Sequence, residues 1–192
     1  MILLSAHKDT VMNNYRLCYS KGKFIGLLDN YIGRLICDSL LLEEPNISLL
    51  EKNGEIGFFY GDSEEWGTIT SLPKIKKEDT VIVVDVAIGG QYRNIDFSLE
   101  NISGIKTDKI KEIKESLEWE GFKLRTIQWD GNPDDEDEAW MWKKLGHKVI
   151  SFIIPIQSGK KRTGWHVDDC SVTYEKLIIC KQGLKRLINY LL

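Results

Sequence analysis

Five side chains of metal-ligating type form an ordered set along this chain. They are His7, Asp29, Glu65, Asp85 and His166, and Glu64 adds a further carboxylate directly before Glu65. A hydrolytic site that holds two divalent ions about 3.5–4 Å apart uses imidazole and carboxylate ligands. One carboxylate is shared between the ions, and another group accepts a proton from the bridging water. The set of residues therefore indicates a two-metal hydrolytic site.

Apolar runs and helical patterns predict the elements that position these residues. Strands are expected at 1–6, 15–20, 23–27, 55–60, 80–86, 123–129 and 147–155, the second and third as a hairpin. Helices are expected at 30–42, 64–72, 108–119, 135–145 and 171–191. This alternation predicts an α/β fold, a three-layer αβα sandwich around a mostly parallel mixed sheet.

The candidate ligands lie where such a sheet binds ligands, beyond the carboxyl ends of its strands. His7 and Asp85 end predicted strands, and the Glu64–Glu65 pair follows a third. His166 follows the last predicted strand after a loop, and Asp29 closes a loop before a helix. We therefore expect these side chains to gather at one edge of the sheet.

Each residue also has an ordinary structural interpretation. Asp29 has the position of a helix N-cap, and the Glu64–Glu65 pair that of acids at a helix start. His7 is accompanied by Asp9, and a carboxylate that accepts the second imidazole N–H is the usual partner of a metal-bound histidine. Asp85 favours the functional interpretation, because an unpaired carboxylate inside a Val-rich strand is strongly destabilising.

The composition indicates which classes of protein are not expected. Lys and Arg number 26 against 29 for Asp and Glu, a net charge of −3, with no basic face, so we expect no nucleic-acid partner. The acidic run at 134–138 is interpreted as a solvated helix start. The four cysteines form no Cys-x-x-Cys pair, and no apolar run approaches about 18 residues. A cytoplasmic protein without a membrane segment is expected.

The strings around these residues resemble the motif series of the co-catalytic zinc exopeptidases. The matching segments are AHKDTV, LLDNYIG, EEWG, VVDV and IPIQSGKKRTGWHVDD, in order over nearly the whole chain. They are most similar to the glutamyl and tetrahedral-assembly aminopeptidases and to the secreted bacterial leucyl aminopeptidases. The resemblance implies two Zn²⁺ ions and a peptide substrate. Co²⁺ and Mn²⁺ also suit sites rich in carboxylates with two histidines.

The resemblance also implies a role for each residue. His7 and Asp85 would hold the first ion, Glu65 and His166 the second, and Asp29 both. Glu64 would be the general base, and Asp9 would orient His7. The family's Gly-Thr-Asp-Ala segment has only a loose counterpart, at Asp137 and Ala139.

We expect a single catalytic-type domain over residues 1–192. The intervals between His7 and Asp29 and between Asp85 and His166 are filled by predicted strands and helices. Neither leaves room for the lid or dimerisation insert of related two-domain enzymes. The helix and hairpin that precede the first histidine in those enzymes have no counterpart before His7.

Three functions remain open from the sequence. The first is an aminopeptidase that hydrolyses short peptides. The second is an amidohydrolase or deacylase of N-acyl amino acids, which a carboxylate-binding residue among Arg93, Arg125 and Arg162 would favour. The third is a non-catalytic metal-binding domain that retains the fold. The oligomeric state is also open, and Trp-rich helices in a lidless domain are compatible with a homo-oligomer.

Overall fold

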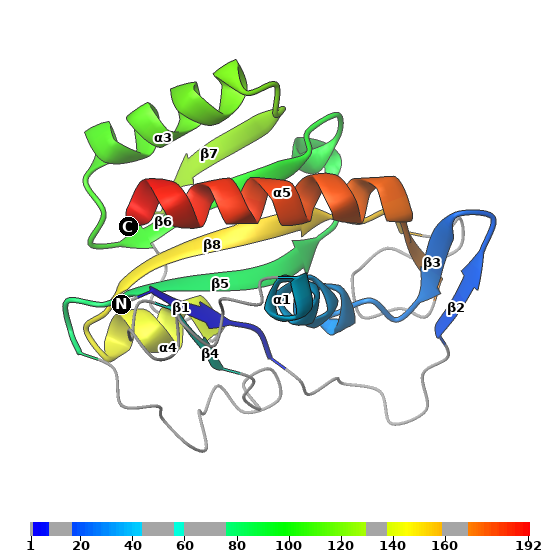
Figure 1. The fold of residues 1–192 in the computed structure, drawn as a ribbon, viewed down its shortest axis with the longest axis horizontal. Helices are drawn as coiled ribbons and strands as arrows, with labels where there is room; N and C mark the ends of the chain where they lie inside the picture. The colour runs from blue at the N-terminus through cyan, green and yellow to red at the C-terminus, as the bar shows by residue number, and fades with distance from the viewer. Residues whose placement is uncertain (1, 8–16, 44–55, 60–75, 130–137, 159–168) are drawn as a thin grey trace.

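The computed structural model describes residues 2–7, 17–43, 56–59, 76–129, 138–158 and 169–192 (Figure 1). These residues form a six-stranded sheet of order β4-β1-β5-β8-β6-β7 and a three-stranded sheet of order β2-β3-β9. The strands are β1 (Ile2–Ser5), β2 (Leu17–Ser20), β3 (Lys23–Gly26), β4 (Ile56–Phe59), β5 (Thr80–Ala87), β6 (Phe97–Ser103), β7 (Leu124–Gln128), β8 (Lys148–Pro155) and β9 (Cys170–Thr173). The helices are α1 (Tyr31–Glu43), α3 (Thr107–Trp119), α4 (Glu138–Lys144) and α5 (Tyr174–Leu191), with a 3₁₀ turn η1 (Gly90–Tyr92).

The large sheet is mixed and mostly parallel. Strands β4, β1, β5 and β8 all run in one direction. Strand β6 is antiparallel to β8, and β7 is parallel to β6. Strands β1, β5 and β8 are mostly apolar because both of their faces are covered, and every residue of β1 is buried. The predicted α/β fold class and mixed sheet are confirmed.

Helices cover both faces of this sheet. On one face α1, α3 and α5 enclose a large core that includes Leu4, Ile82, Val84 and Phe152. On the other face α4 packs Trp142 and Ala139 over Leu3, Val81 and Val83. Alternate residues of a strand point to opposite faces, so β1 and β5 contribute to both cores. Figure 1 shows α5 lying along the sheet beside α1, with α4 on the opposite side.

The small sheet brings the chain before α1 beside the start of α5. Strands β2 and β3 form a hairpin whose turn, Lys21–Gly22, has positive φ at both residues. Such a turn matches the twist of a two-stranded hairpin. Strand β3 then pairs with β9 in antiparallel register, Gly26 opposite Cys170. The residues that lead into α1 are thereby fixed near the first turn of α5.

Two strands and one helix boundary differ from the sequence expectation. Strand β6 was not predicted, because Ser98, Glu100 and Asn101 interrupt its apolar pattern although all three are buried. Strand β9 precedes the last helix, which begins at Tyr174 rather than at 171 because the Thr173 side chain caps it by accepting from the Lys176 N–H at 3.1 Å. The helix predicted at 64–72 lies outside the described residues. None of the described helices has both the length and the apolar character needed to span a membrane.

Candidate metal centre

His7 and Asp85 are brought together by the register of two parallel strands. β1 pairs with β5 so that Ser5 lies opposite Val83. Two further residues along each chain bring His7 alongside Asp85, at the carboxyl ends of both strands. Because side chains alternate, His7 and Asp85 share the face of the sheet that carries Leu3, Val81 and Val83. The predicted juxtaposition of these two candidate ligands is therefore observed.

Asp29 reaches the same place from the loop before α1. Its neighbour Asn30 accepts a hydrogen bond from the Gly33 N–H at 3.0 Å and donates to the Val84 carbonyl at 2.6 Å. Asn30, rather than Asp29, thus caps the start of α1 and ties it to β5. The peptide bond between the two residues is cis. The capping position of α1 is thus taken by Asn30, and the Asp29 carboxylate lies beside the His7 ring.

The three side chains form a cluster of suitable size for a metal ion. His7 Nε2 lies 3.3 Å from Asp29 Oδ1 and 3.8 Å from Asp85 Oδ1. One ligand atom from each residue lies within 4.8 Å of the other two. Ligand atoms arranged tetrahedrally at about 2.0–2.1 Å from Zn²⁺ are roughly 3.3 Å apart. The nitrogen and carboxylate donors therefore fit a divalent ion such as zinc.

The environment of the cluster disfavours two free carboxylates. His7 and Asp29 are 4 % and 6 % exposed, and the side chain of Asp85 is 27 % exposed. Burial, followed by the Asp29 carboxylate, raises the pKa of Asp85 to about 6, against the opposing effect of His7. A bound cation would offset this repulsion, because an opposite charge stabilises the ionised form of each acid.

A buried glutamate beneath this cluster was missed from the sequence. Glu138, at the start of α4, is 4 % exposed and accepts a hydrogen bond from Ser5 Oγ through its Oε1. Ser5 Oγ in turn accepts from Trp142 Nε1 at 2.9 Å. Glu138 Oε2 is buried, and it has no hydrogen-bond partner among the residues that the structure describes. The interpretation of 134–138 as a solvated helix start is wrong for Glu138, because α4 packs its first turn against β1.

The Glu138 carboxyl is electrostatically coupled to the cluster. Burial raises its pKa to about 7, the charge of Asp85 acts in the same direction, and His7 and the Ser5 hydrogen bond oppose it. Glu138, Asp85 and Glu100 also line a small cavity of about 40 Å³ between α4 and the sheet. The sequence signal that could have identified Glu138 is its place in the segment aligned loosely with the family's Gly-Thr-Asp-Ala motif.

The other predicted site residues lie outside the described part of the chain. They are the general base Glu64, the ligands Glu65 and His166, and Asp9, the partner proposed for His7. Their roles stay predictions. Asp137 lies outside it too, whereas Ala139, in the first turn of α4, is described and packs in the core between α4 and the sheet.

No protein-family model and no curated protein matches the chain. Solved structures do match it. The TET1 peptidase of Pyrococcus horikoshii, which can assemble into a tetrahedron or a large octahedral shell, has a TM-score of 0.60 at 14 % identity. The match covers 91 % of this chain and 52 % of that one.

Two further aminopeptidases give similar values. A TET aminopeptidase from a marine sediment archaeon of the Thaumarchaeota matches with a TM-score of 0.58 at 16 % identity, over 91 % of this chain and 51 % of its own. Aminopeptidase I from Clostridium acetobutylicum matches with a TM-score of 0.58 at 15 % identity, over 89 % and 46 %. This chain spans about half the length of these enzymes. It has the fold of these aminopeptidases, as the motif resemblance predicted, and carries a histidine and two aspartates of metal-ligating type together at the strand ends.

Proposed function

We propose that this chain is a metal-dependent aminopeptidase that hydrolyses short peptides. The observation that carries the proposal is the convergence of His7, Asp29 and Asp85 at the carboxyl edge of a sheet whose fold matches aminopeptidases. In such sheets, ligands bind beyond the carboxyl ends of the strands.

In the proposed site, His7 and Asp85 would hold one divalent ion, Glu65 and His166 would hold a second, and Asp29 would be shared between them. Bound zinc lowers the pKa of water towards about 7 and polarises a carbonyl group. The support for the first ion is the spacing of the donors, 3.3 and 3.8 Å from His7 Nε2. The assignment of the second ion rests on the sequence motifs.

Glu64 takes a proton from the attacking water and delivers it to the leaving amine in the proposed mechanism. Asp9 would fix the ring orientation of His7 by accepting its second N–H, as the partner carboxylate of a metal-bound histidine does. Asn30 holds the start of α1 against β5, so that the Asp29 carboxylate stays next to His7. The protein residues thus orient the ligands and move the proton.

The test is Glu64→Gln, assayed on chromogenic aminoacyl substrates with added Zn²⁺, Co²⁺ or Mn²⁺. We expect loss of turnover with an unchanged metal content, because the amide cannot accept the proton. The matched control is Glu112→Gln, which changes an exposed residue on α3. Full activity in Glu64→Gln would remove Glu64 as the base, and no activity of the unaltered protein on any substrate would reject the peptidase.

A deacylase of N-acyl amino acids is the second candidate. It is favoured by one observation, that Arg93 lines a large pocket beyond the ends of β5 and β8. Adding N-acyl amino acids to the same assay separates it from the aminopeptidase. A non-catalytic metal-binding domain would bind zinc and hydrolyse neither class of substrate.

Self-association is part of the proposal, since the Pyrococcus horikoshii TET1 peptidase forms large assemblies. Sedimentation of the purified chain measures it.

A further inference from the structure

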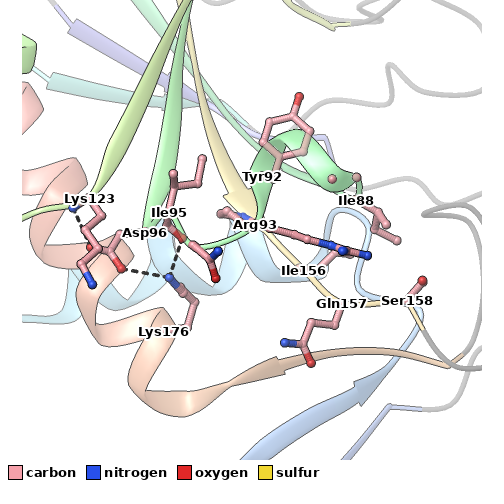
Figure 2. A pocket seen from close by; sticks show the side chains of 14 residues that line it. Ile88, Tyr92, Arg93, Ile95, Asp96, Lys123, Ile156, Gln157, Ser158 and Lys176 are labelled. Carbon is pink, nitrogen blue, oxygen red and sulfur yellow. Dashed lines mark hydrogen bonds and ion pairs between the residues drawn. The ribbon is translucent and has the colours of Figure 1, made fainter.

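A pocket of about 730 Å³ opens beyond the carboxyl ends of β5 and β8 (Figure 2). Its walls include the segments 88–90 and 155–158, which continue these two strands, together with residues 92–96 and the first turn of α5. The volume lies within the range of small-molecule sites, about 300–1,000 Å³. Nothing in the metal cluster itself uses this space, since none of His7, Asp29 and Asp85 is among the described lining residues.

The pocket has an excess of positive charge. Its described lining includes three cationic side chains, Arg93, Lys123 and Lys176, and one carboxylate, Asp96. Both oxygens of the Asp96 carboxylate already have partners. Its Oδ1 lies 2.9 Å from Lys176 Nζ, and its Oδ2 accepts from the Lys123 backbone N–H at 2.9 Å. Lys176 also donates to the Ile95 carbonyl at 2.8 Å. The Asp96–Lys176 pair is therefore part of the wall.

Arg93 differs from this paired lysine. Its backbone N–H closes η1 by donating to the Gly90 carbonyl at 3.2 Å, which fixes the point from which the side chain leaves. No ion pair or side-chain hydrogen bond of Arg93 occurs within the described residues. Figure 2 shows the side chain extending past the end of β8 towards Ile88. A guanidinium group in this setting is suited to bidentate binding of a carboxylate.

The near edge of the pocket lies a short peptide's length from the metal cluster. Ile88 follows Asp85 by three residues, which at roughly 3.3 Å per residue is about 10 Å. An extended tripeptide spans about the same distance. Val86 and Ala87 separate Asp85 from Ile88 in the chain, and Gly89 and Gly90, which follow at the edge of the pocket, carry no side chain.

We propose that this pocket binds the terminal carboxylate of a short peptide substrate through Arg93. This inference deepens the aminopeptidase proposal and rests on it, because the peptide's first carbonyl must lie at the metal cluster. Arg93 is here a specificity residue that does not touch the reacting atoms.

The direct test is binding, which does not depend on turnover. Amide resonances of ¹⁵N-labelled full-length protein are followed during titration with N-acetylglycine, N-acetylglycine amide and inorganic phosphate. We expect saturable shifts at Gly89, Gly90 and Arg93 with the acid, much weaker shifts with the amide, and a Kd about tenfold higher in Arg93→Gln. Arg93→Lys should recover part of the affinity, because it keeps the charge without the planar fork.

The matched control is Lys148→Gln, which removes one positive charge at the opposite, amino end of β8. It should bind the acid as the unaltered protein does. Equal binding of acid and amide, or an unchanged Kd in Arg93→Gln, would overturn the proposal. Preferential binding of phosphate at the same residues would overturn the carboxylate assignment.

Kinetics then separate this inference from the proposed function. For Leu-Gly-Gly and its C-terminal amide, the ratio of kcat/KM for acid over amide should fall about tenfold in Arg93→Gln and stay unchanged in Lys148→Gln. A preserved ratio in Arg93→Gln refutes the carboxylate site even if hydrolysis occurs. Absence of hydrolysis in every variant refutes the aminopeptidase while the binding titration still reports on the pocket.

Discussion

Replacing Glu138 by Gln should change how the stability of the metal-free protein depends on pH. Glu138 is 4 % exposed, its Oε1 accepts from Ser5 Oγ, and its Oε2 has no hydrogen-bond partner within the described part of the chain. Burial is the largest cause that raises its pKa, from 4.5 to about 7. The folded state therefore binds this proton more tightly than the unfolded state does. Gln has nearly the same shape and does not titrate in this range.

The sign follows from the raised pKa. The stability that the proton provides is fully present below about pH 4.5 and is lost as the pH rises through about 7. A shift of this size, at about 1.4 kcal/mol per pKa unit, corresponds to roughly 3 kcal/mol. Glu138→Gln should remove about this much of the decline in the free energy of unfolding between pH 4.5 and 8. Asp85, whose pKa is raised to about 6, should still contribute its own part of this decline in Glu138→Gln.

The assay is urea unfolding, followed by circular dichroism at several pH values with a chelator present. The control is Glu112→Gln, because the Glu112 side chain is 68 % exposed on α3 and should leave the pH profile unchanged. A decline of the same size in Glu138→Gln and in the unaltered protein would refute the reasoning. It would mean that Glu138 is ionised in the folded state at little cost.

Two further substitutions test the packing around the site. In Gly33→Ala, the new Cβ would collide with Asn30 Oδ1 and the Val84 carbonyl, so we expect the free energy of unfolding to fall by about 1–3 kcal/mol and zinc to bind more weakly. The control is Gly90→Ala, whose Cβ meets no atom within 4 Å and which should keep the Tm of the unaltered protein in thermal melts. Trp142→Phe removes the N–H that donates to Ser5 Oγ at 2.9 Å and should cost about 1–3 kcal/mol in urea unfolding, and an unchanged midpoint would contradict this.

Much of the fold is predictable because local patterns and tertiary packing agree. The run from Thr80 to Val86 is β-branched at every position except Asp85 and becomes the central strand β5. The alternation of strands and helices indicates the layers. Strand β6 escapes prediction because its buried Glu100 is stabilised by distant partners, Tyr92 Oη at 3.0 Å and Trp129 Nε1 at 2.7 Å. Such partners are not visible in a local pattern.

The candidate site, like the fold, is only partly predictable from local sequence patterns. That His7 and Asp85 end strands is readable from the sequence, whereas their alignment depends on the β1–β5 register. Asp29 and Asn30 are equally good caps by residue type, and only the contacts of Asn30 with Gly33 and Val84 decide between them. Glu138 was predicted to be solvent-exposed, because the sequence pattern of an acidic run does not depend on whether its last residue packs against a strand. Burial of a single carboxylate is a tertiary property.

The most direct test of the account is the zinc content of the protein. The purified chain is loaded with excess Zn²⁺, desalted and analysed for bound metal, alongside Asp85→Asn and the distant control Lys148→Gln. The proposal predicts two equivalents in the unaltered protein and in Lys148→Gln, and at most one in Asp85→Asn, since His7 and Asp29 alone hold an ion weakly. Absence of zinc from the reconstituted protein, or the same content in Asp85→Asn, would contradict the metal centre.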